Sequence, residues 1–199
     1  MVTPEGECGN DDCDSFVNQQ GGCSLKTLWR YAMKQLISCL IVIIPVLAWG
    51  ADKSPDQDFF KHAAEGGIAE VEAGKLAQSK GNSQAVKDFG AMMVKDHTDA
   101  NAKLKSIAAG ENVDLPNSSG ATQMASKAKL EVLTGDTFDK AYIKNQVLAH
   151  EQTVSLFKKE IASGTDAQAK AFAKETLPTV QAHLRKIRDI AAQAGVETK

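Results

Sequence analysis

Three histidines occupy positions where the apolar pattern of a predicted helix calls for a core residue. His97, His150 and His183 each interrupt the apolar stripe of a different helix. These stripes advance in steps of three and four residues, which is typical of a helix face packed against a core. Imidazole nitrogens are ligands for zinc, copper, iron and nickel. Three of the four histidines of the chain are therefore placed where they could hold a transition metal.

Carboxylate and thioether side chains accompany these histidines. Glu70 lies at the edge of the apolar arc of a further predicted helix, whereas the other acidic residues near it point away from that arc. Asp96 directly precedes His97, and we expect its carboxylate to hold that ring in one tautomer. Met93 lies four residues before His97 on the same face, and its thioether would favour copper(I).

Helix geometry predicts that the four candidate ligands converge near the middle of one bundle. His97 and His150 each lie about 13 residues into their helices, which a crossover connection makes parallel. Antiparallel pairing of the first two helices places Glu70 about one turn from His97, and pairing of the last two places His183 about one turn from His150. The sequence therefore predicts a site for copper, zinc or iron formed by His97, His150, His183 and Glu70.

The same residues also fit a purely structural polar core. Buried imidazoles can be hydrogen-bonded by one another, by Glu70 or by Asp96, and such a network would fix the register of the helices. The Glu-x-x-His pairs of di-iron bundles are absent, because valine precedes each core histidine by three residues (Val94, Val147 and Val180). Since no catalytic triad, nucleophile elbow or phosphate loop is present either, we do not expect an enzyme.

Four long helices and one short helix are predicted to carry these side chains. Capping residues, prolines and glycines set their bounds at about 54–80, 83–109, 121–133, 136–163 and 165–194. Asp136 or Thr137 is expected to cap the fourth of these segments, and Thr165 the last. Pro178 lies inside the last helix and should kink it.

The order of these segments predicts an all-α fold. Short joins make two antiparallel hairpins, and a long crossover that contains the short helix connects them. This arrangement is that of a ferritin-like four-helix bundle. Residues 51–199 contain no cysteine and equal numbers of acidic and basic residues. A disulfide scaffold, a cysteine-bound metal site and nucleic-acid binding are therefore not expected for this part.

The first fifty residues form a different kind of segment, which holds all four cysteines. A lysine after Met33 precedes an apolar run over 36–49, which is shorter than the roughly 20 residues of a membrane-spanning helix. A small-x-small motif follows, so residues 33–50 are predicted to be a signal peptide that is cleaved before Ala51. Residues 1–32 would then be a removed or spurious leader. The alternative is a membrane anchor formed by 36–49.

Four motifs of the chain resemble one bacterial family. They read DFFKHAAEGGIAEVE at 58–72, MVKDH at 93–97, AHEQ at 149–152 and TLPTVQAHL at 176–184. In order and spacing they are similar to the family of domain of unknown function 4142. This family is placed in the ferritin-like group, and its members are often labelled as outer membrane proteins. The resemblance covers about residues 54–194 and implies an exported ferritin-like bundle, without any established activity.

Three functions follow from these observations as alternatives. The first is a periplasmic bundle over 51–199 that acts as a binding or envelope-stress accessory protein, with an envelope protein as its partner. The second is a metal-binding or metal-redox protein that uses the histidines and Glu70. The third is an interaction module anchored through 36–49. Neither nucleic-acid binding nor stable membrane insertion of the mature domain is expected.

Overall fold

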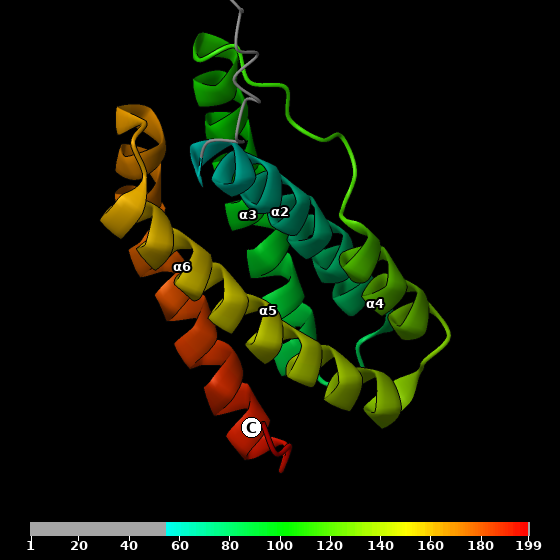
Figure 1. The fold of residues 1–199 in the computed structure, drawn as a ribbon. Coiled ribbons are helices and arrows are strands. Elements are labelled where there is room, and N and C mark those ends of the chain that lie inside the picture. Colours follow the sequence, from blue (N-terminus) through cyan, green and yellow to red (C-terminus); the bar gives the residue numbers. More distant parts are fainter. Residues whose placement is uncertain (1–54, 199) are drawn as a thin grey trace, which may run out of the picture. The chain divides into compact units, whose positions relative to one another are not determined.

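A computed structural model describes residues 55–198 and folds them into five helices, with no strand among these residues (Figure 1). The helices are α2 (Pro55–Lys80), α3 (Gln84–Gly110), α4 (Ala121–Glu131), α5 (Gly135–Ser163) and α6 (Ala167–Gln193). The all-α prediction is confirmed for this part of the chain. Within it, no helix combines the length and the apolar character needed to cross a membrane. The predicted leader, signal peptide and anchor segment lie outside the described residues.

Two long hairpins make up most of the bundle. α2 packs along α3, and α5 packs along α6. Between the hairpins, α2 contacts α5 and α3 contacts α6, so that each long helix has two long neighbours. Followed by colour in Figure 1, α3 and α5 run in the same direction, and the connection after α3 passes back along the bundle to α4. The short helix α4 then covers α2 and α5.

The caps of α3 and α5 tie the two hairpins together at one end. Ser83 caps α3, and its side chain accepts a backbone N–H of the first turn at 3.3 Å. α5 begins at Gly135 after Thr134, so the prediction that Asp136 or Thr137 caps it was wrong. Asp136 instead accepts a hydrogen bond of 2.7 Å from the side chain of Asn82. The Asp136 carboxylate, which local capping rules assigned to α5, thus makes a longer-range contact instead.

The start of α6 also differs from the prediction. Asp166 caps this helix, and its carboxylate accepts the backbone N–H of Ala169 at 2.6 Å. Thr165 was the expected cap, but its hydroxyl donates to Asp56 at the start of α2 at 2.5 Å. Because that contact occupies the hydroxyl, capping passes to the next residue. The helix then continues past Pro178 without interruption.

Glycines allow α2 and α3 to pack closely where they cross. A Cβ atom on Gly74 would lie 2.6 Å from the carbonyl oxygen of Gly90, and one on Gly90 would lie 2.7 Å from the Cβ of Ala77. Real side chains do not come this close, so the crossing requires glycine at both positions. Gly74 faces Gly90 in the register that the sequence predicts for this hairpin, with Glu70 one turn away along α2.

The apolar core of the bundle is divided into two clusters. One contains Phe89 and Met93 of α3 together with side chains from the first half of α5 and the second half of α6. The other contains Phe59, Phe157 and Phe172, whose rings pack edge-on or tilted against one another. Along every long helix, one buried polar residue lies between the parts that belong to the two clusters. These four residues are Glu70, His97, His150 and His183.

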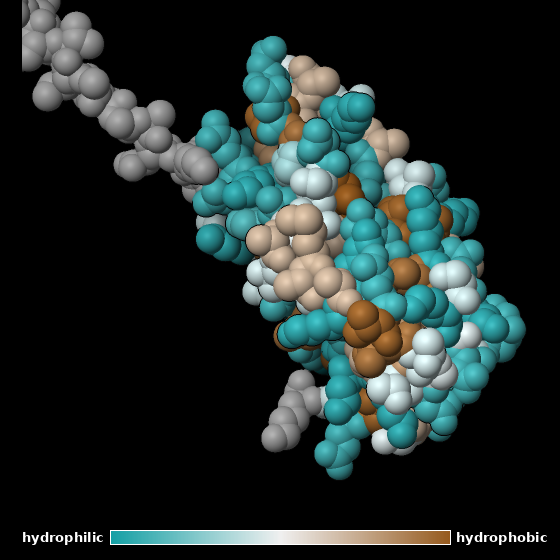
Figure 2. Space-filling view, turned by 90° about the vertical axis from the view of Figure 1, so that its right-hand side faces the viewer, coloured by the Kyte–Doolittle hydropathy of each residue, from teal (hydrophilic) through white to brown (hydrophobic). Residues whose placement is uncertain are grey.

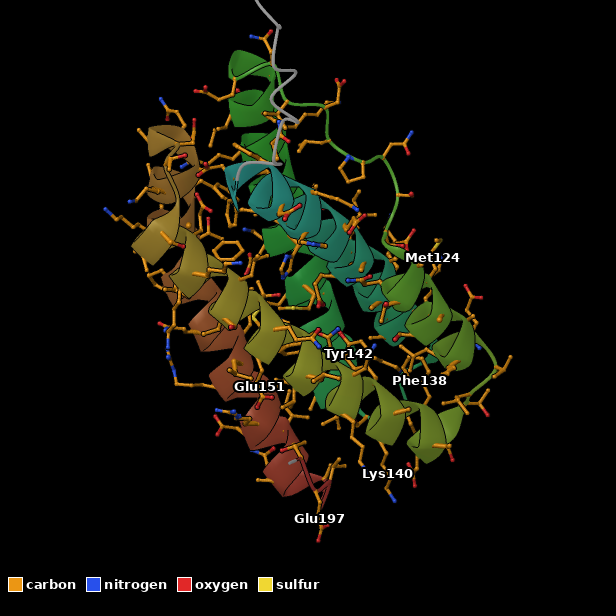
Figure 3. The ribbon with its side chains drawn as sticks, in the orientation of Figure 1. Met124, Phe138, Lys140, Tyr142, Glu151 and Glu197 are labelled. Atoms are coloured by element: carbon orange, nitrogen blue, oxygen red, sulfur yellow. The ribbon has the colours of Figure 1, made fainter. Side chains whose placement is uncertain are left out.

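The outside of the bundle is mainly polar on the face shown in Figure 2. Hydrophilic residues predominate there, and hydrophobic residues occur only in small groups. Three large hydrophobic residues are exposed in the described part of the chain: Met124 (49%), Leu148 (54%) and Val132 (80%). In Figure 3, Met124 lies on the outer side of α4. Single exposed apolar residues of this kind are ordinary on a soluble surface.

Candidate metal centre

Three buried imidazoles meet in the middle of the bundle. His97 comes from α3, His150 from α5 and His183 from α6. Their ring centroids lie 5.6–6.0 Å apart. One ligand nitrogen of each ring lies within 4.8 Å of a ligand nitrogen of both other rings. The exposed fractions of the residues are 9%, 1% and 3%, so the structure brings the three predicted imidazoles together away from solvent.

Hydrogen bonds on the outer side of the group fix the tautomers of two rings. His150 Nδ1 lies 2.9 Å from the carbonyl oxygen of Gln146. His183 Nε2 lies 3.0 Å from Asp96 Oδ2. A carbonyl oxygen and a carboxylate only accept, so these ring nitrogens carry the protons. In a neutral ring the opposite nitrogen has the lone pair, and these nitrogens are His150 Nε2 and His183 Nδ1. Both are buried without a hydrogen-bond partner, as is His97 Nε2.

Burial keeps two of the imidazoles, those of His97 and His183, in the form that binds metal. Burial and, to a smaller extent, the neighbouring rings of His150 and His183 lower the pKa of His97 to about 3. Burial also lowers the pKa of His183, although the hydrogen bond to Asp96 opposes this effect. His97 and His183 are therefore neutral at physiological pH. Neutral imidazole is the species that coordinates metal ions, since a protonated ring has no free lone pair.

Asp96 supports a different histidine from the predicted one. The sequence suggested His97 as its partner, but its carboxylate accepts from His183 on the neighbouring helix. Successive helix residues point about 100° apart, so Asp96 turns away from the ring that follows it and toward α6. Burial raises the pKa of Asp96, but hydrogen bonds from His183 and Lys95 outweigh this and hold it below its ordinary value. The ionised carboxylate thus links α3 to α6.

Glu70 lies at the edge of this group. Glu70 is 6% exposed, and its Oε2 has no hydrogen-bond partner. Burial raises its pKa, against the opposing effects of His150 and of a hydrogen bond with the Gln146 side chain. Glu70 also lines a small cavity of about 30 Å³ together with His97. In the described residues, however, the groups that lie mutually within 4.8 Å are the three histidines, without Glu70.

Met93 belongs to the apolar packing around the site. It is fully buried in the same core cluster as Phe89. The Phe89 ring lies 6.1 Å from the His150 ring and 6.5 Å from the His183 ring, centroid to centroid and near edge-on. Met93 was predicted from the sequence as a possible soft ligand, whereas Phe89 was not predicted to be near the site. Its ring forms part of the apolar surroundings of two imidazoles.

Gln146 and Tyr142 complete the surroundings of Glu70 and were also missed. Gln146 is 1% exposed, and its Oε1 has no hydrogen-bond partner. Burial and the nearby Glu70 raise the pKa of Tyr142, whose hydroxyl is likewise buried without a partner. Figure 3 shows Tyr142 on α5 within the bundle, whereas Lys140 points outward. Tyr142, Gln146 and His150 follow one another at intervals of four residues, which places them on one face of α5. This spacing is the sequence signal that could have identified Tyr142 and Gln146.

The spacing of the three rings is close to that of a three-histidine metal site. At metal–nitrogen distances of about 2.0–2.1 Å, the nitrogens of a tetrahedral site lie about 3.3 Å apart. Nitrogens within 4.8 Å of one another would each have to move inward by about 1 Å at most. Such a site leaves a fourth position open, and the Glu70 carboxylate interacts electrostatically with His150.

Comparisons with known proteins give a family and a fold. The family described as domain of unknown function (DUF4142) matches residues 47–190. The structure is similar to a DUF305 protein from Streptomyces coelicolor that is provisionally described as secreted, with a TM-score of 0.62, 15% identity, and 73% of this chain and 97% of that chain covered. For a DUF305 fragment from Deinococcus radiodurans, the TM-score is 0.62 at 8% identity, with 70% and 96% covered. No curated protein matches the chain. At these identities, the likeness shows a shared fold alone.

Proposed function

This chain belongs to the family described as domain of unknown function (DUF4142), and we propose that it is an exported protein that binds a transition-metal ion inside a ferritin-like four-helix bundle. The family description states no activity, so the proposal rests on the site. The packing of the two hairpins and the long connection between them support the ferritin-like arrangement.

The three unpartnered ring nitrogens carry this proposal. A buried polar atom without a partner costs about 1–3 kcal/mol. A purely structural cluster would avoid this cost by hydrogen-bonding its rings to one another. Instead, His150 and His183 donate outward, and their opposite ring nitrogens are left without a partner, as is His97 Nε2. A bound metal ion would satisfy all three nitrogens at once.

The donor set favours zinc or copper(II). His97, His150 and His183 are the proposed ligands, with Glu70 as the fourth after a rotation of its side chain. Three imidazoles and one carboxylate suit these ions, whereas a di-iron centre needs more carboxylates. Asp96 and the Gln146 carbonyl hold two of the rings in the ligating tautomer. Because Met93 is packed in the core, copper(I) is less favoured.

Metal analysis of the purified protein tests this function. After treatment with a chelator, the protein is expected to bind one zinc or copper ion with its histidines, and His150→Ala should abolish this binding. His62→Ala is the matched control, because the His62 side chain is 55% exposed and lies outside the cluster. His97→Ala provides a second variant. Equal binding by the His62 and His150 variants, once circular dichroism shows both to be helical, would refute the proposal.

Export to the periplasm is the proposed location. The predicted signal peptide over 33–50 supports it, as does the description of the Streptomyces DUF305 protein as secreted. N-terminal sequencing of the protein from its producing cells should give Ala51 as the first residue. A chain that keeps 36–49 would instead be the membrane-anchored interaction module.

A second candidate is a metal-free binding or envelope-stress accessory protein. The hydrogen bond from His183 to Asp96 favours it, because it joins two helices without any ion. The two candidates differ in what they predict for His97→Leu. Since His97 Nε2 has no partner, loss of a metal ligand should not destabilise the metal-free protein. Removal of a network member would cost about 1–3 kcal/mol, which urea unfolding in the presence of a chelator can resolve.

A further inference from the structure

A cleft between α3 and α6 connects the surface with the three-imidazole group. Its volume is about 210 Å³, and its inner wall includes His97 and His183. Its outer wall includes Asp99 and Glu175, whose side chains are 71% and 67% exposed. The cleft therefore extends from solvent-exposed acidic groups to two of the three buried histidines.

Charged side chains are concentrated in this cleft. Three acidic residues line it, Asp96, Asp99 and Glu175, and Lys103 is the one basic residue in its lining. Lys103 Nζ on α3 lies 2.5 Å from Glu175 Oε2 on α6, so an exposed ion pair joins the two walls. Negative charge along an opening attracts cations, whereas a lysine opposes their entry.

A second cavity does not contact the three imidazoles. It lies between α2, α4 and α5, has a volume of about 310 Å³, and is lined by Glu70 and Gln146. None of His97, His150 and His183 lines it. A cation in this cavity would meet the Glu70 carboxyl, but it would still be separated from the ring nitrogens.

We propose that the cleft between α3 and α6 is the entry route for a divalent metal cation, and that the Lys103–Glu175 ion pair controls entry. This inference rests on the proposed metal-binding function and adds the route to it. A water molecule occupies about 30 Å³ of liquid volume, so the cleft of about 210 Å³ admits a partly hydrated ion. The acidic residues draw the cation in, while Lys103 competes with it for Glu175.

Stopped-flow measurement of cobalt(II) binding to the metal-free full-length protein tests the route. The absorption spectrum of cobalt(II) differs between nitrogen and thiolate ligands. Binding to the histidines can therefore be distinguished from binding to the N-terminal cysteines. Asp99→Asn should slow association about two- to fivefold, and Lys103→Met should accelerate it by a similar factor, because rim charges act mainly on the association rate. Both effects should shrink at high salt. Asp189→Asn is the control, since Asp189 is an exposed acid of α6 outside the cleft lining.

A pair of bulky substitutions tests the path itself. Thr179→Phe places a ring on the exposed α6 wall of the cleft and should slow cobalt entry, while Thr122→Phe, at the rim of the other cavity, should leave it unchanged. The route is overturned if Thr122→Phe is the slower variant, or if the cleft variants load at the rate of Asp189→Asn. Failure of the metal-binding function would look different, because cobalt would then bind equally to the unaltered protein and to His150→Ala.

Discussion

The positions of two protons determine what the centre of the bundle can hold. Because His150 donates to a backbone carbonyl and His183 to a carboxylate, each ring keeps its lone pair on the side of the other imidazoles. Reversing either tautomer would present an N–H group to that space and exclude a cation. In the proposed metal site, the acceptors behind the rings, Asp96 and the Gln146 carbonyl, therefore matter as much as the proposed ligands.

Replacement of Asp96 tests this dependence on the tautomer. Asp96→Ala removes the acceptor for His183, and we expect zinc affinity to fall about 10–100-fold, as measured by competition with a chelator. Asp88→Ala is the control, because Asp88 is a residue of the same helix, outside the site, whose carboxylate bonds only to Gln84 in the contacts described. Equal affinities of the two variants would show that the Asp96 carboxylate does not orient the ring.

Glu160, in the last turn of α5, makes a pH-dependent contribution to the stability of the protein. Burial and, to a smaller extent, the hydrogen bond with Asp56 raise its pKa from 4.5 to about 7. Asp56 has a pKa lowered to about 2, because hydrogen bonds from Thr165 and Asp166 outweigh its burial. Between pH 4.5 and 7, the folded chain therefore binds a proton at Glu160 that the unfolded chain has lost. Stability falls as pH rises through this range.

Glu160→Gln should remove this dependence. Glutamine keeps the shape and cannot ionise, so unfolding in urea at pH 5 and pH 8 should show the unaltered protein losing about 2 kcal/mol more than the variant. His97 and His183, whose lowered pKa values act in the opposite direction, are present in both proteins and cancel in the difference. Identical pH profiles for the two proteins would contradict this expectation. Glu197→Gln, at the exposed chain end, should leave the profile unchanged.

The sequence could identify the three histidines but not every partner around them. A histidine on an apolar stripe is visible in the helical period, and so His97, His150 and His183 could be found. The partner of Asp96 could not, because it depends on how α3 and α6 rotate against each other. Gln146 was missed because a glutamine on a core face gives no motif, even though it lies four residues before His150.

At the level of helices, the crossing of α2 and α3 sets the height of Glu70 relative to His97. Gly74 and Gly90 pack backbone to backbone, and their mutual contact fixes the register of the hairpin. Regular pairing of two adjacent helices predicted this register correctly. The caps of α5 and α6 were predicted less well, because Asp136 bonds to Asn82 in the turn before α3, and Thr165 bonds to Asp56 of α2. Local capping rules cannot anticipate such contacts.

A pair of glycine substitutions in α2 tests the role of the crossing. In Gly74→Ala, the new Cβ would lie 2.6 Å from a backbone oxygen, so the helices must separate, and we expect a loss of about 1–3 kcal/mol in urea unfolding. A Cβ added to Gly66 in the same helix would have no atom within 4 Å. Gly66→Ala should therefore stabilise the protein by about 0.5–1 kcal/mol. Equal effects of the two changes would refute a special role for the crossing.

In the bundle as a whole, the polar layer separates two apolar clusters. Each cluster takes side chains from all four long helices, and both pack against the layer of Glu70 and the histidines. Cooperative units of a protein can open with different free energies when few apolar contacts join them. We therefore expect the amides on the two sides of the layer to differ in hydrogen-exchange protection in the metal-free protein.

Zinc should reduce that difference, because an ion that binds only the folded centre stabilises it by about 2.7 kcal/mol at 100 times the dissociation constant. Hydrogen exchange followed by mass spectrometry, with and without zinc, measures the change on both sides of the layer. Protection that rises only on one side would show that the ion does not connect the two clusters. The His150→Ala protein serves as the reference without the site.

The distribution of the three histidines over α3, α5 and α6 also determines whether folding or metal binding comes first. The first hairpin supplies one imidazole and the second supplies two, so neither hairpin can form the site alone. In the proposed metal-binding protein, both hairpins must assemble before an ion can be held. A chain exported in an unfolded form would thus acquire its ion only after translocation, and the metals available in that compartment, rather than those of the cytoplasm, would decide which one it carries.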